Sequence, residues 1–246
     1  MPENLLSLLA DATLQTLYMV AAAAAISAVA GLPLGAFLAT SSRGSLFAAP
    51  RLNRLLETIV DLTGSTPFII LAIAIIPFTR LITGTSAGTS AAIVPLAIVA
   101  TSFIAKTVES AIRDVDQGLV EASRAMGATP LQIVLKVLLP AARQAIVLGF
   151  KLGLVSLFGN AAILGAVGGG GLGDLSIRFG YQRFSPEIMT AVVIVLIVFV
   201  QIIQFFGNRL ARNAARGRDR NIRPSRSPAL ESRMDYARRL VSHTRA

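Results

Sequence analysis

The 246-residue sequence contains no cysteine and no tryptophan, and only 15% of its residues are charged, whereas soluble domains carry about 25%. The absence of cysteine excludes disulfide bonds and thiolate metal sites. The single histidine, His243, lies near the C-terminus, which excludes a Ser-His or histidine-metal centre within the apolar part of the chain. No phosphate-binding loop of the G-x-x-x-x-G-K-S/T type is present. We therefore expect neither a bound cofactor nor ATP hydrolysis by this chain, and no enzyme.

Hydrophobic residues make up 54% of the sequence, and the mean hydropathy is +0.67. The few charges are unevenly placed and leave five long stretches without Asp, Glu, Lys or Arg. About 20 apolar residues in a helix cross the hydrocarbon core, and lipid allows only helices or closed barrels to do so. The alternation of a barrel is absent, so the sequence predicts an all-α polytopic membrane protein with five transmembrane helices. The predicted spans are 14–40, 59–80, 91–111, 146–168 and 188–208, within a domain of residues 12–208.

The loops between these spans differ sharply in basic residues. If alternate loops lie on the same side, one side holds 20 of the 23 Lys and Arg residues, and the other holds only Arg80, Arg178 and Arg183. Cytoplasmic loops are enriched in Lys and Arg. The rule places the N-terminus outside and the C-terminus in the cytoplasm.

The tail of residues 209–246 carries eleven of the arginines. Such a segment favours disorder and contact with anionic lipid headgroups. It has no interleaved aromatic residues and no motif that recognises nucleic acid. We therefore expect a solvated, mostly disordered tail that can contact membrane lipids, and no nucleic-acid partner.

Several residues within the spans predict how the helices pack. Gly31 and Gly35 have the spacing that permits close helix contact. Pro67, Pro77 and Pro95 lie at membrane depth and are expected to break helices there, which suggests a bundle with a path or cavity.

Between the third and fourth spans, residues 114–143 are predicted to form two short cytoplasmic helices. Asp116 can cap the first, which presents Leu119 and Met126 and ends at Gly127. The second begins at Thr129-Pro130-Leu131-Gln132, a capping sequence, and ends at Pro140. It is apolar nearly all round, with Leu131, Val134, Leu135 and Leu138 on one stripe. A cytoplasmic helix of this kind must be buried on more than one side, so the segment is predicted to dock a partner.

This segment carries the residues Glu121, Ala122, Ser123, Gly127, Val137, Leu139 and Pro140, spaced Glu-Ala-Ser, three residues, Gly, nine residues, Val, one residue, Leu-Pro. The pattern resembles the EAA motif of permease subunits of binding-protein-dependent type I ABC importers, with Ser123 in place of an alanine and Val137 in place of an isoleucine. Both replacements are small. The motif falls in the predicted cytoplasmic segment, where the family has it.

Within that family, several stretches between about Leu14 and Arg212 are most similar to permeases of methionine importers: Pro67–Leu71, Ile76–Arg80, Gly84–Ser86, Ala91–Leu96 and Glu121–Pro130. The resemblance implies a type I importer fold with five spans and cytoplasmic coupling helices. It also implies a homodimer, two cytoplasmic ABC ATPase subunits that hydrolyse ATP, and an external methionine-binding lipoprotein. In the family the EAA helix sits in a groove of the ATPase, so Glu121 would pair with a partner cation and Gly127 would allow close approach of its backbone. No residue is assigned to substrate binding.

Other interpretations of the sequence remain. A self-sufficient secondary transporter or channel would show repeated halves and ionisable residues in the membrane. Asp61, Lys106, Glu109 and Lys151 are candidates for such an ion path, although charges at cytoplasmic helix ends are the simpler interpretation.

The run Gly168–Gly173 formally matches a dinucleotide fingerprint but follows a span and not a strand, so we interpret it as a flexible external loop. With Asp174 it also resembles the GxGD sequence of intramembrane aspartyl proteases. Such an enzyme needs a second aspartate within reach, and Asp61 is the only candidate near a span.

Overall fold

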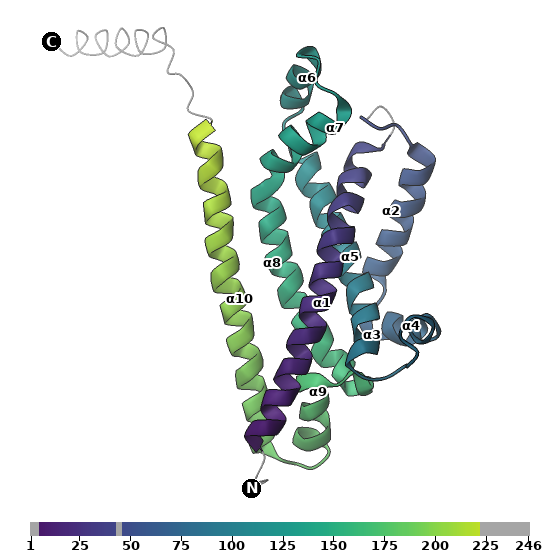
Figure 1. The fold of residues 1–246 in the computed structure, drawn as a ribbon, viewed down its shortest axis with the longest axis vertical. Helices are drawn as coiled ribbons and strands as arrows, with labels where there is room; N and C mark the ends of the chain where they lie inside the picture. The colour runs from purple at the N-terminus through teal and green to yellow at the C-terminus, as the bar shows by residue number, and fades with distance from the viewer. Residues whose placement is uncertain (1–4, 43–45, 222–246) are drawn as a thin grey trace, which may run out of the picture.

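The computed structural model describes residues 5–42 and 46–221. Every regular element in these ranges is a helix, which confirms the all-α prediction. Four helices run through the bundle and are long and apolar enough to cross a membrane (Figure 1). They are α1 (Leu5–Thr40), α5 (Thr89–Arg113), α8 (Leu139–Leu164) with the turns that flank it, and α10 (Pro186–Asn221).

The second predicted span, residues 59–80, is not one straight helix. The chain forms α2 (Pro50–Ser65), α3 (Phe68–Ala74) and α4 (Ile76–Thr83), and α3 is bent by 114° from α2. Thr66 adopts an extended conformation because the ring of Pro67 disfavours the helical conformation of the residue before it. If α2 and α3 together count as one crossing, the number of spans is five.

Pro95, in contrast, does not break its helix, and α5 continues unbroken from Thr89 to Arg113. Helices α1 and α5 make the most extensive contact in the bundle. At this contact, a Cβ added to Gly31 would lie 2.9 Å from Ile104, and one added to Gly35 would meet the carbonyl of Ala105. The predicted small-residue contact therefore forms, and it brings the backbones of α1 and α5 together.

The core divides into two main clusters along the bundle. One lies between α1, α5 and α8, includes Met19, Leu96 and Phe158, and is extended by the ring of Phe199, stacked 5.8 Å from Phe158. The other surrounds the opposite end of α5 and includes Ile104, Val108 and Ile112. The second cluster also receives residues of the predicted docking segment and therefore joins that segment to the membrane helices.

The second helix of that segment does not end at Pro140 as the sequence predicted. Helix α7 (Pro130–Ile133) passes into a π-helical turn, η1 (Val134–Leu138), and then into α8. In this wider turn the N–H of Leu139 bonds to the carbonyl of Val134, five residues earlier. Pro140 then lies in the first turn of α8, directly after this wider turn, and the helix continues past it.

The glycine-rich run is packed and not a flexible loop. Turn η2 (Gly165–Gly169) leads into α9 (Gly171–Leu175) and then η3 (Ser176–Tyr181). The N–H groups of Gly171 and Leu172 donate to the side chains of Gln15 and Thr16 of α1, at 2.9 and 2.8 Å. Glycine is required because Gly170 and Gly171 have φ values of +79° and +72°.

Helix α10 extends beyond the predicted boundary at residue 208 and is helical to Asn221. The sequence from 209 to 221 is rich in Ala and Arg, which favour helix, and it contains no proline. The prediction of disorder is therefore wrong for 209–221. The rest of the predicted tail, 222–246, lies outside the described residues.

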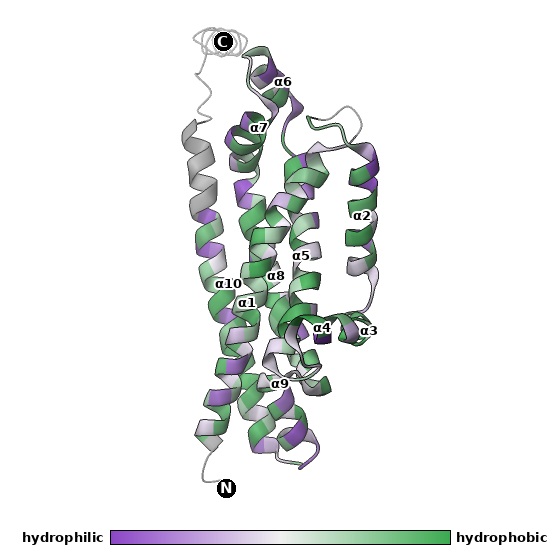
Figure 2. Ribbon diagram, turned by 45° about the vertical axis from the view of Figure 1, so that its right-hand side comes forward, coloured by the Kyte–Doolittle hydropathy of each residue, from purple (hydrophilic) through white to green (hydrophobic). Residues whose placement is uncertain are grey.

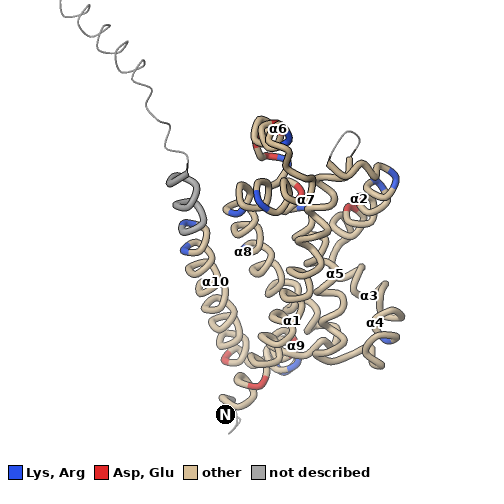
Figure 3. The backbone as a smooth tube through the Cα atoms, turned by 45° about the horizontal axis from the view of Figure 1, so that its top comes forward, with Lys and Arg blue, Asp and Glu red and all other residues tan. Residues whose placement is uncertain are grey.

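Polar and charged residues lie mainly at the two ends of the bundle. Hydrophilic residues gather around α6 (Gln117–Ala125) and α7 at one end and around α9 at the other (Figure 2). Lys and Arg are concentrated at the end that carries α6 and α7 (Figure 3). This distribution matches the separation of basic loops that the sequence predicted.

Candidate functional site

Helix α6 begins at the N-cap that the sequence predicted. The carboxylate of Asp116 accepts a hydrogen bond of 2.8 Å from the N–H of Gly118. This bond satisfies one of the four N–H groups that have no partner within the helix. The helix lies at the basic end of the bundle, beside α7 (Figure 1).

Gly127 ends this helix through a specific hydrogen-bonding pattern. Its N–H donates to the carbonyl of Arg124 at 2.9 Å, and the N–H of Ala128 donates to the carbonyl of Ser123 at 3.0 Å. This pair of bonds forms a Schellman motif, which requires a left-handed residue at the position of Gly127. Gly127 has φ +81°, and a Cβ added to it would meet nothing within 4 Å. The glycine is thus needed for the turn and also leaves open space above it.

The other residues of the Glu-Ala-Ser sequence point in two directions. Glu121 and Ala122 are exposed, whereas Ser123 is buried and donates a hydrogen bond of 2.6 Å to the carbonyl of Leu119. Among the described residues, no ion pair or hydrogen bond engages the Glu121 carboxylate. The acid is therefore available to a partner on the outer surface of α6.

Helix α7 begins with the predicted capping box. The hydroxyl of Thr129 accepts from the N–H of Gln132, and the side chain of Gln132 accepts from the N–H of Thr129. Pro130 occupies the first turn. These reciprocal bonds fix the direction in which the chain enters the turn of η1.

One side of α7 and η1 packs on the membrane helices. Ile133, Val134 and Leu138 are buried against the end of α5 and the beginning of α8, with Val137 and Leu139 partly buried beside them. Pro140 is exposed at the start of α8. The docking segment and the helices α5 and α8 therefore share one apolar core.

The opposite side is apolar and exposed. Four large apolar side chains of the segment are exposed, and we call them together the outer apolar face: Leu119, Met126, Leu131 and Leu135, of which Met126 is 80% exposed. The sequence placed Leu131 and Leu135 on the same stripe as Val134 and Leu138, whereas the structure separates them. The π-helical turn changes the rotation per residue, so a single helical period does not predict which residues are buried. Exposed apolar surfaces of this kind mark interaction sites.

A network of charges links α2 to α5 below this segment. Lys106 lies 2.8 Å from Asp61 of α2 and 3.2 Å from Glu109 of α5, and Arg113 lies 2.6 Å from Glu109. The side chain of Glu109 is only 3% exposed, so its carboxylate relies on the two cations for compensation. These charges cross-link helices, as expected for pairing at a helix end.

The arrangement does not fit an aspartyl protease. Asp61 is paired with Lys106, whereas Asp174 of α9 is paired with Arg178 one turn later. The two acids therefore have separate cationic partners and do not share a proton. Across residues 5–42 and 46–221, no group of three or more His, Asp or Glu side chains is arranged to hold a metal ion.

Comparison with known proteins adds independent information. Residues 31–219 match the family model described as the binding-protein-dependent transport system inner membrane component. A probable D-methionine transport system permease protein MetI from Vibrio cholerae is 51% identical over 205 residues, which cover 83% of this chain and 91% of that protein. The D-methionine transport system permease protein MetI of Escherichia coli K12 is 46% identical over 165 residues, covering 67% and 76%.

The fold is also similar to solved structures. A chain of the MetNI methionine ABC transporter in an inward-facing conformation superposes with a TM-score of 0.84 at 44% identity, covering 87% of this chain and 99% of that chain. A chain of an amino acid ABC transporter crystallised with histidines superposes with a TM-score of 0.63 at 20% identity, which supports the fold alone.

Proposed function

The chain belongs to the family of inner membrane components of binding-protein-dependent transport systems, and we propose that it is the permease subunit of an ATP-driven methionine importer. The proposal of methionine is supported by relatives at 51% and 46% identity that are named for D-methionine transport. The described helices supply the membrane pathway, and a separate subunit supplies ATP hydrolysis.

Two copies of the chain would form the pathway between them. Each copy has only four or five crossings, which is a small bundle to enclose a route for an amino acid. Exposed apolar side chains along α2, including Leu55, Ile59 and Leu62, are available to lipid or to a second copy. A two-fold axis places the same surface of both copies around one pathway.

The basic end of the bundle would face the cytoplasm, with the N-terminus outside and the C-terminus inside. The positive-inside rule supports this orientation because Lys and Arg gather at the end that carries α6 and α7 (Figure 3). Two ABC ATPase subunits would bind at that end. A methionine-binding lipoprotein would deliver substrate at the opposite end, near α4 and α9.

The main support for the proposal is that the docking segment packs on the membrane helices on one side and is exposed on the other. Its outer apolar face is exposed, whereas its inner side lies in one core with α5 and α8. A partner that binds the outer face and moves would displace the membrane helices through that core. In the motif, Glu121, Ala122 and Gly127 would contact the ATPase, and Ser123, Val137, Leu139 and Pro140 would hold the shape of the segment.

The experiment is reconstitution of the chain in proteoliposomes with its ATPase and binding protein. We expect uptake of labelled methionine only when ATP and all three proteins are present. An ATPase variant that binds but does not hydrolyse ATP is the control and should abolish uptake. Methionine flux through the chain alone, without ATP, would contradict the proposal and favour a self-sufficient transporter or channel.

A further inference from the structure

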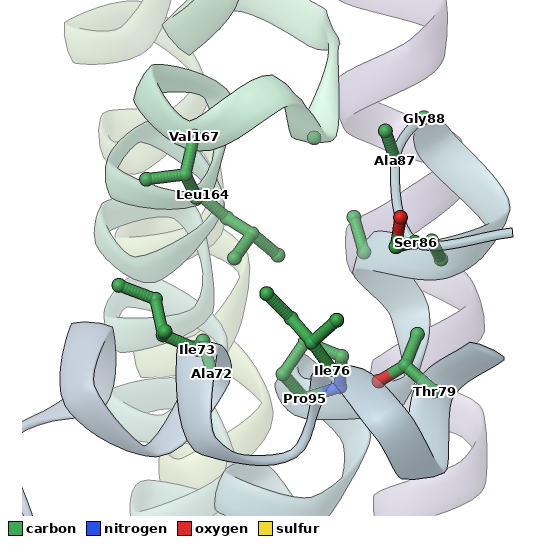
Figure 4. Close-up of a pocket in the computed structure, with 13 residues that line it drawn as sticks. Ala72, Ile73, Ile76, Thr79, Ser86, Ala87, Gly88, Pro95, Leu164 and Val167 are labelled. Atoms are coloured by element: carbon green, nitrogen blue, oxygen red, sulfur yellow. The ribbon is translucent and has the colours of Figure 1, made fainter.

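A small cavity lies at the opposite end of the bundle from the docking segment. Its walls come from α3, α4, the beginning of α5 and the turn η2 (Figure 4). The floor is formed by buried residues, including Ala72, Ala91 and Leu164, whereas Ile76 at its rim is partly exposed. The cavity can therefore be reached from outside the bundle.

The helix breaks create this cavity. The 114° bend between α2 and α3 and the break between α3 and α4 divide this part of the chain into short helices, which line the cavity together with α5. The far wall is held in place because the N–H of Gly88 donates a hydrogen bond of 2.8 Å to the carbonyl of Gly168 in η2.

A buried side-chain hydroxyl in the cavity has no hydrogen-bond partner among the described residues. Thr79 of α4 is 3% exposed, and its hydroxyl oxygen is buried without a hydrogen bond. A buried hydroxyl without a partner costs free energy, so a ligand that accepts its hydrogen bond would be favoured. Pro95 also lines the cavity. Because proline has no N–H, the carbonyl oxygen of Ala91, one turn earlier in α5, lacks its usual helical donor and is a second polar atom without its helical partner.

The size and composition of the cavity restrict the ligand. It is partly open and has a volume of about 50 Å³, which is one third of the roughly 150 Å³ that accepts benzene in an apolar protein cavity. That volume suits about two heavy atoms. None of the described residues that line the cavity is charged, so it favours a neutral group. A terminal methylthio group fits all three conditions, because it has two heavy atoms, carries no charge and has a sulfur that is a weak hydrogen-bond acceptor.

We infer that this cavity binds the methylthio end of the transported amino acid, with the hydroxyl of Thr79 directed at the sulfur. The inference rests on the proposed function and names the part of the permease that selects the side chain. The charged amino and carboxylate groups of the substrate remain outside the cavity, beyond the rim.

The test uses the complete transporter in proteoliposomes and compares uptake of methionine, norleucine and ethionine. Norleucine replaces the sulfur with a methylene, and ethionine adds one methylene beyond it. Wild-type protein should discriminate against ethionine by about tenfold, the effect of one methylene too many in a fitted pocket. Thr79→Val keeps the shape but removes the hydroxyl, and should shift the methionine-to-norleucine ratio by about threefold towards norleucine.

Two further variants change the volume. Ile76→Ala widens the rim and should raise ethionine uptake relative to methionine. Ala91→Val adds two carbons to the floor and should reduce methionine uptake about tenfold. Ala74→Val, on an exposed residue of α3 that does not line the cavity, is the matched control and should behave as wild type.

The outcomes distinguish a failure of the proposed function from a failure of the inference about the cavity. If wild-type transporter shows no ATP-dependent methionine uptake, the proposed function is wrong. If wild type transports methionine and Thr79→Val, Ile76→Ala and Ala91→Val all leave the ratios among the three amino acids unchanged, the cavity does not hold the side chain. Loss of uptake by Ala91→Val alone, with unchanged ratios in the other two variants, also overturns the inference, because that result reports only damage to the core.

Discussion

The ammonium of Lys106 in α5 lies 2.8 Å from the carboxylate of Asp61 in α2. This pair joins the broken second crossing to the central helix of the bundle. The same ammonium contacts Glu109, which is buried, whereas the side chain of Asp61 is 53% exposed. Lys106 is therefore the shared cation of the network, and its loss affects a buried acid as well as an exposed one.

Replacing Lys106 should destabilise the protein more than replacing Asp61. Lys106→Met leaves Glu109 with Arg113 as its single cation and should lower the free energy of unfolding by about 1 to 3 kcal/mol. Asp61→Asn removes an exposed partner, so its effect should be under about 1 kcal/mol. Thermal unfolding of the two purified variants gives the ranking. Equal melting temperatures would show that Glu109 does not depend on Lys106.

The contact between α1 and α5 should tolerate no side chain at Gly35. Gly35→Ala would push a methyl group into the carbonyl of Ala105 and should cost about 1 to 3 kcal/mol of stability. Gly64→Ala is the control because an added Cβ there meets nothing within 4 Å, and it should be neutral or slightly stabilising. The melting temperatures of the two variants in one detergent test this difference. A melting temperature of Gly35→Ala equal to that of Gly64→Ala would contradict the close contact.

The two roles of Gly127 can be separated by two substitutions. Gly127→Ala places a Cβ on a residue with φ +81° and should cost about 1 kcal/mol. Asn tolerates the left-handed conformation better, so Gly127→Asn should retain most of the stability. If the ATPase approaches this residue closely, both variants should reduce methionine uptake, as should Glu121→Lys. Full uptake by Gly127→Asn would assign the glycine to the turn alone.

Much of the fold follows from the sequence because its signals are local. The gaps between charges locate the apolar crossings, and Asp116, Thr129 and Gly127 act as the helix ends that their residue types predict. The small-residue spacing of Gly31 and Gly35 also forms the contact it predicts. Each of these features can be predicted from a few residues that are close together in the sequence, with one physical rule for each feature.

The errors occur where the outcome depends on distant residues. Pro67 bends the chain, whereas Pro95 lies inside a continuous helix, and only the surrounding packing distinguishes them. The π-helical turn before Pro140 carries the helix past a residue that was expected to end it. The glycine run folds against Gln15 and Thr16, more than 150 residues away in the chain. The prolines suggested a path or cavity in the bundle, but the position of the cavity at Thr79 depends on how these separate segments pack, so the sequence did not locate it.

Neighbouring leucines of the docking segment should behave differently. Leu138 is 4% exposed in the core, so Leu138→Ala should cost about 2 to 5 kcal/mol of stability. Leu135 is 55% exposed, so Leu135→Glu should leave the melting temperature nearly unchanged. The second variant should instead weaken binding of the ATPase by at least about tenfold. Tyr181→Glu, an exposed position at the opposite end of the bundle, is the control for binding in a pull-down of the purified complex.

The most direct test of the coupling role uses the absence of cysteine from this chain. A single cysteine introduced as Leu135→Cys can be cross-linked to the reconstituted ATPase and followed through the ATP cycle, with Tyr181→Cys as the control. We predict that the cysteine at position 135 cross-links to the ATPase and is protected from a water-soluble thiol reagent, whereas the control does neither. A cysteine at position 135 that stays fully reactive to the reagent and never cross-links during methionine uptake would contradict the account.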